Sequence, residues 1–82
     1  MKIGDIVTLS RFAVDSGMSL YGYNEMIVAE TNPFICVSPD YKMVWRKLTP
    51  EDVVYQGTAL PKAVQKARNR YAQGSKTLVH HR

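Results

Sequence analysis

The sequence predicts a single small domain, mainly β, in which five short antiparallel strands precede one C-terminal helix. Residues 1–57 contain five short runs rich in β-branched, aromatic and other apolar residues, separated by turn residues. Residues 58–74 instead repeat apolar side chains at helical spacing. The length of 82 residues suits one domain. A core this small would gain stability from a bound partner or from forming a homo-oligomer.

The first three strands are predicted over residues 6–9, 25–30 and 34–38. Gly4-Asp5 forms a turn before the first, and Thr31-Asn32-Pro33 separates the second from the third. Residues 11–24 form a long connection in which Gly17 and Gly22 argue against a helix. Alternation along the strands predicts which side chains point into the core: Val7, Leu9, Met26, Val28, and Val53 or Val54.

The fourth strand is predicted over residues 42–48 and a short fifth strand over residues 53–56. Between them, residues 49–52 have the form of a single helical turn, with Thr49 as the cap and Pro50 at the first position. Trp45 is expected to pack in the core or between elements, with an exposed binding surface as the alternative. Cys36 stands between apolar neighbours, which indicates a buried structural thiol.

Residues 58–73 are predicted to form the helix, with Thr58 as its N-cap, Pro61 in its first turn and Gly74 as its C-terminal stop. Four apolar residues recur at spacings of four, three and four, so one helix face is expected to dock on the core: Leu60, Val64, Ala67 and Tyr71. The chain thus divides into strands (1–57), a basic helix (58–74) and a flexible tail (75–82).

Five strands with a helical turn between the fourth and fifth follow the order of an SH3-like barrel. The opening Gly4-Asp5-Ile6-Val7-Thr8-Leu9 resembles the GD-x-V-x-L start of small bacterial and phage proteins of the YodC-like group. Met26-Ile27-Val28 resembles the Met-x-Val second strand of that group, and residues 48–54 resemble its closing turn and strand. Cys36 and Trp45 are similar to its cysteine and tryptophan, although nine positions separate them here, too many for one strand. The resemblance covers about residues 1–57 and implies an SH3-like or KOW-like barrel from a bacterium or phage.

Charge is divided unevenly along the chain. Residues 58–82 contain six lysines and arginines and no acid, whereas residues 1–57 contain five against seven acids. Lys62, Lys66 and Arg70 recur every four residues on one helix face, and like charges at this spacing destabilise an isolated helix. The stripe is therefore either a solvated face or, as we favour, a face that binds an anionic partner.

Two functions from different classes fit this pattern. The favoured one is sequence-tolerant nucleic-acid binding, with phosphates on the basic helix and bases stacked on tyrosines. The alternative is a protein-interaction module, such as a phage-type modulator of a host protein with an acidic surface. Two pairs of residues have a second interpretation. Tyr21 and Tyr23 of the long connection could instead pack on the barrel, and the strand cations Arg46 and Lys47 could simply be solvated. The predicted nucleic-acid-binding residues are Lys62, Lys66, Arg68, Arg70, Lys76, Arg46, Lys47, Tyr21 and Tyr23.

The residues of a catalytic site do not occur in a recognisable pattern, so the chain is predicted not to be an enzyme. His80 and His81 are adjacent and lack a third ligand at metal spacing, and no glycine-rich phosphate loop occurs. Neither a metal nor another cofactor is therefore expected. We find neither an apolar run of membrane-spanning length nor a signal peptide in the sequence. We expect no membrane partner and, given the single cysteine, a cytoplasmic location in a bacterium or phage-infected host.

Overall fold

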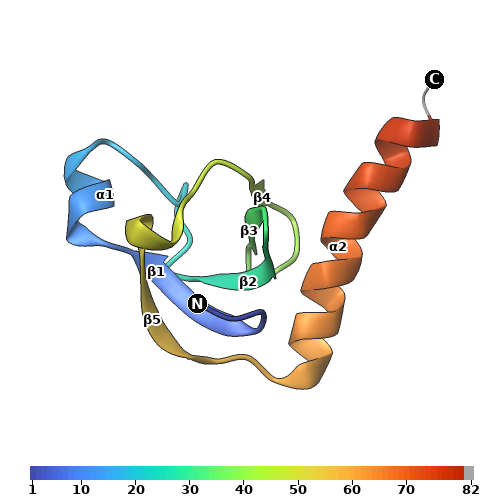
Figure 1. Cartoon of the computed structure of the whole chain (residues 1–82), viewed down its shortest axis with the longest axis horizontal. Helices are drawn as coiled ribbons and strands as arrows, with labels where there is room; N and C mark the ends of the chain where they lie inside the picture. The colour runs from blue at the N-terminus through green and yellow to red at the C-terminus, as the bar shows by residue number, and fades with distance from the viewer. Residues whose placement is uncertain (81–82) are drawn as a thin grey trace.

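The computed structural model describes the backbone of residues 1–80 and the side chains of residues 1–72. Five antiparallel strands form one sheet in the order β4-β3-β2-β1-β5, with α2 lying along one side of it (Figure 1). The elements are β1 (Asp5–Leu9), α1 (Arg11–Asp15), β2 (Met26–Thr31), β3 (Phe34–Val37), β4 (Val44–Trp45), the 3-10 turn η1 (Pro50–Asp52), β5 (Val53–Thr58) and α2 (Pro61–His80).

The predicted class, mainly β with one C-terminal helix, is confirmed. The strands β1 to β4 follow one another across the sheet, and β5 returns to pair with β1. Strands β4 and β5 are thus the two edges, and no pairing between them closes the described strands into a barrel. The SH3-like barrel therefore remains a prediction.

Apolar side chains from both faces of the sheet are buried, in two clusters. Along β2, Met26 and Val28 enter one cluster while Ile27 and Ala29 enter the other, as the two-residue period of a strand requires. The first cluster is covered by residues of the 16–25 connection and of the segments around η1. Its buried members are Val7, Leu20, Met26, Val28, Phe34, Cys36, Leu48 and Val53. Of the core residues predicted from alternation, Leu9 is only partly buried and Val54 is exposed.

The second cluster lies beneath α2, which packs on β2 and β3. Ala67 is fully buried there, and Val64 and Tyr71 pack beside it, so this part of the predicted docking face is confirmed. Gly4 allows the close approach: a Cβ at this position would lie 3.2 Å from Cγ2 of Val64, and its φ of +97° disfavours any other residue. Leu60 was expected on the docking face, but it precedes the first helical residue and is 76% exposed.

The ends of the basic helix also differ from the prediction. Thr58 is the last residue of β5 instead of the N-cap, because β5 continues beside β1 up to the pairing of Thr58 with Asp5. Gly74 does not stop α2, whose backbone stays helical to His80. The flexible tail predicted for residues 75–82 stays a prediction. A glycine inside a helix costs only about 1 kcal/mol relative to alanine, which the good helix formers on either side can offset.

Two local predictions in the first 50 residues are wrong for reasons of hydrogen bonding. The long connection begins with α1, because the Ser10 hydroxyl caps it by accepting from the Ala13 N–H at 3.1 Å. The fourth strand is shorter than predicted because the Ser38 hydroxyl accepts from the backbone N–H groups of Lys42 and Met43, which would otherwise be available to a strand. By contrast, the helical turn at residues 49–52 is confirmed as η1.

None of the described helices combines the length with the apolar character that crossing a bilayer requires.

Candidate functional site

The predicted basic helix meets the β3–β4 loop through Arg70. Its Nε donates a hydrogen bond to the carbonyl oxygen of Tyr41 at 2.9 Å, and its Nη2 donates to the carbonyl oxygen of Lys42 at 3.3 Å. The Arg70 side chain is half-buried. Arg70 therefore fastens the loop to the helix. Two of its guanidinium N–H groups are occupied by hydrogen bonds within the molecule.

Two further cations lie over aromatic rings at the same junction. The Nζ of Lys66 is 5.9 Å from the centroid of the Tyr41 ring, and the Cζ of Arg46 is 5.3 Å from the centroid of the Tyr71 ring. Both distances fit cation–π contacts. Arg46 follows β4 in the net acidic part of the chain, so folding brings its charge to α2, beside Tyr71. We call Arg46, Lys66 and Arg70 the basic face.

The other predicted cations lie elsewhere. Arg68 points toward Glu30, with Nη2 4.0 Å from Oε2, and its side chain is half exposed. Lys62 is exposed in the first turn of α2, one turn before Lys66. Lys47 is exposed and lines a hollow on the far side of β4. Lys76 lies outside the residues whose side chains are described.

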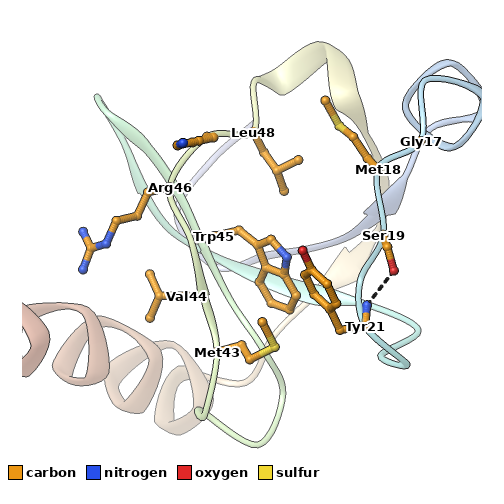
Figure 2. Close-up of a pocket in the computed structure, with 10 residues that line it drawn as sticks. Gly17, Met18, Ser19, Tyr21, Met43, Val44, Trp45, Arg46 and Leu48 are labelled. Atoms are coloured by element: carbon orange, nitrogen blue, oxygen red, sulfur yellow. Dashed lines mark hydrogen bonds between the residues drawn. The ribbon is translucent and has the colours of Figure 1, made fainter.

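The hollow lies between the segment 17–21 and the segment 43–48, and its volume is about 640 Å³. Figure 2 shows Trp45 and Tyr21 pointing into this space from opposite sides, while Arg46 points away from it toward α2. The Tyr21 side chain is 71% exposed. The remaining lining is mainly apolar and includes Met18, Met43 and Leu48.

The two tyrosines of the long connection therefore behave differently. Tyr23 packs edge-on against Trp45, with ring centroids 5.9 Å apart and planes at 87°. Its hydroxyl donates to Oδ2 of Asp40 at 2.7 Å. For Tyr23 the packing interpretation is confirmed, whereas Tyr21 is exposed and available to a ligand.

Asp40 also holds the β3–β4 loop, through hydrogen bonds within the loop and to Tyr23. The Ser38 hydroxyl donates to its Oδ1 at 2.7 Å, and the Lys42 N–H donates to the same oxygen at 3.0 Å. These bonds favour the ionised carboxylate, and the pKa of Asp40 is lowered to about 2, chiefly by Ser38 and then by Tyr23. The same carboxylate raises the pKa of Tyr23. The loop that carries Tyr41 is thus held by both Asp40 and Arg70.

Tyr41 lies at the centre of this candidate site, although the sequence did not single it out. Its ring lies under Lys66, and its carbonyl oxygen accepts a hydrogen bond from Nε of Arg70. Its φ of +63° is unusual for a bulky residue. The available signal was the Ser38-Pro39-Asp40 turn, since a side-chain-bonded turn often forces the following residue into the left-handed region.

Cys36 and Trp45 are direct partners in the register of β3 and β4. Cys36 is fully buried, and burial raises the pKa of its thiol to about 12, so the predicted structural thiol is confirmed. Trp45 packs against the first cluster and also faces the hollow. Among the residues that the structure describes, no three possible metal ligands come together.

No protein-family model, curated protein or solved structure matches this chain.

Proposed function

We propose that this chain is a small non-enzymatic module that binds nucleic acid with little sequence preference, through phosphates on the basic face. The observation that carries the proposal is the placement of Arg46 and Lys66, from two segments of the chain, over aromatic rings where α2 meets residues 41–46. Each of these cations keeps its charged group near the surface over an aromatic ring. Such cations can meet phosphates, which carry charge but no base identity.

The fixed β3–β4 loop supports the proposal. Arg70 and Asp40 both hold the loop, so Tyr41 and the Lys66 above it are positioned before a ligand arrives. Pre-positioned groups lose less conformational entropy on binding. Arg70 acts here as a positioning residue and Lys66 as the contact residue.

An acidic protein surface is the second candidate, and exposed apolar side chains around α1 favour it. Phe12 is 67% exposed, Val14 is 53% exposed and Met18 is 38% exposed. Apolar surface of this kind can mark a protein contact. In this case the basic face would meet carboxylates while the residues around α1 meet apolar side chains.

The test compares single charge removals at two places. Arg46→Gln and Lys66→Gln are each measured against Arg11→Gln, which removes the same charge from α1, at the opposite end of the molecule from α2 in Figure 1. Binding of a random-sequence single-stranded oligonucleotide at low salt should weaken several-fold for the first two variants. The control should bind like the unmodified chain, because the Arg11 side chain is 93% exposed and, among the residues whose side chains are described, pairs with Asp15 alone.

Equal weakening in all three variants would mean that overall charge, not the basic face, attracts the oligonucleotide. Polyglutamate serves as the competing probe. If the unmodified chain binds polyglutamate but not the oligonucleotide, the nucleic-acid proposal fails and the acidic-protein candidate replaces it. Circular dichroism of each variant establishes that the fold is retained.

A further inference from the structure

The hollow beside β4 has the size and lining of a site for a small planar group. Its volume of about 640 Å³ falls within the range of about 300–1,000 Å³ that is common for small-ligand sites. Two aromatic side chains, Trp45 and Tyr21, enter it from opposite sides, and two methionines contribute soft apolar surface (Figure 2). Its lining includes two exposed cations, Arg46 and Lys47.

Tyr21 is held at this hollow by an unusual backbone conformation. Its φ is +53° and that of the following Gly22 is +96°, and its N–H donates to the Ser19 hydroxyl at 2.9 Å. A bulky residue rarely adopts the left-handed region, and such residues concentrate at ligand sites. The conformation keeps a large ring 71% exposed beside apolar surface.

Trp45 contributes an unused hydrogen-bond donor. Its Nε1 is buried and has no acceptor in the part of the chain whose side chains are described. A buried donor without a partner is uncommon in folded proteins. An acceptor on an incoming group would satisfy it.

The position of β4 connects this hollow to the basic face. β4 is an edge strand, and its two residues point to opposite sides: Trp45 belongs to the first cluster and Val44 to the second, beneath α2. Arg46 follows directly and points toward α2 (Figure 2). A flexible strand that turns around this edge can reach both sides, whereas duplex DNA is stiff over about 150 base pairs.

We propose that the hollow takes one unstacked nucleobase of a single strand whose phosphates lie on the basic face. This inference rests on the proposed function and narrows its ligand to single-stranded nucleic acid. The base stacks on Tyr21, because every base has a π-face, and a carbonyl or ring nitrogen on its edge accepts from Nε1 of Trp45. A base within a duplex is stacked and paired, so its edge is not available to this site.

The test uses Trp45, the single tryptophan of the chain, as a fluorescent reporter. The full chain is titrated at low salt with oligothymidylate, with an abasic single strand of equal length and with a duplex. One stacked base is worth about 1–3 kcal/mol, which corresponds to about 5–150-fold in affinity. We expect oligothymidylate to bind at least about fivefold more tightly than the abasic strand and to change Trp45 fluorescence, which the abasic strand and the duplex should leave unchanged.

Two tyrosine variants complete the test. Tyr21→Ala should remove most of the advantage of oligothymidylate and leave binding of the abasic strand unchanged. Tyr55→Ala, which removes another exposed tyrosine from β5, should alter neither. Equal binding of oligothymidylate and the abasic strand, or an equal fluorescence change with the duplex, would overturn the base site and leave the proposed function standing. If neither single strand binds, both proposals fail.

Discussion

The two sides of the sheet are covered in different ways. On one side α2 lays a regular stripe of small and apolar side chains, centred on Ala67, over β2 and β3. On the other side the irregular connection 16–25 and the turn η1 cover the first cluster and leave a hollow beside Trp45. The helix-covered side is therefore closed and carries the cations of α2, whereas the loop-covered side keeps a hollow.

The largest effect that we expect concerns Cys36 on the loop-covered side. Full burial and a thiol pKa of about 12 leave almost no reactive thiolate in the folded chain. Labelling should then occur through unfolded molecules, whose fraction is about 10⁻³–10⁻⁶ for ordinary stabilities. A thiol reagent should therefore react at least about a thousandfold more slowly with the native chain than with the chain in urea. Rapid native labelling would show that the loop cover opens locally.

Core substitutions measure how tightly each side is packed. Met26→Ala on the loop-covered side should lower the free energy of unfolding by about 2–5 kcal/mol, because it leaves a cavity at a fully buried site. Ala67→Leu, on the side of α2 that faces the sheet, should lower the free energy of unfolding by about 1–3 kcal/mol through overpacking. Urea unfolding gives both values. A negligible loss for Met26→Ala would mean that the loop cover collapses to fill the cavity.

Two arginines on α2 sharpen the comparison within the helix-covered side. Arg70→Ala removes two hydrogen bonds from a charged group to loop carbonyls and should cost about 1–3 kcal/mol of unfolding free energy. Arg68→Ala removes only a half-exposed ion pair at 4.0 Å and should stay within about 0.5 kcal/mol. If the two costs were equal, Arg70 would not fasten the loop.

The smallest effect that we expect is the dependence of stability on Asp40. Its folded-state pKa of about 2 lies below the ordinary value of 3.8. The carboxylate therefore stabilises the fold above about pH 4, and this contribution is lost as the pH falls from about 4 toward 2. Asp40→Asn should flatten the stability profile over that interval. An unchanged profile in urea melts would exclude this carboxylate as the cause.

Much of the fold could be predicted from local pattern. The alternation in β1 and β2, the capped turn η1 and the positions of Val64, Ala67 and Tyr71 on α2 all follow from residue spacing. The short length of β4 could not be predicted in this way. The Ser38 hydroxyl accepts from the backbone N–H groups of Lys42 and Met43, a contact that residue spacing does not reveal. The end of the helix was also missed, because glycine is permitted inside a helix as well as after one.

The candidate site was predictable only in part. Charge spacing identified Lys66 and Arg70, but it could not separate a contact residue from one that fastens a loop. Arg46 joins this face through Tyr71, a contact between segments 25 residues apart in the chain. Such contacts depend on how the edge strand meets the helix, which no local pattern specifies.

Binding of phosphates by the basic face is tested most directly by the slope of log affinity against log salt concentration. Each phosphate contact on a single strand contributes about 0.7 to the magnitude of this slope. Replacing both Arg46 and Lys66 by glutamine should therefore lower the magnitude by about 1.4, while Arg11→Gln should leave it unchanged. If the double variant keeps the slope of the unmodified chain, the basic face does not bind phosphates.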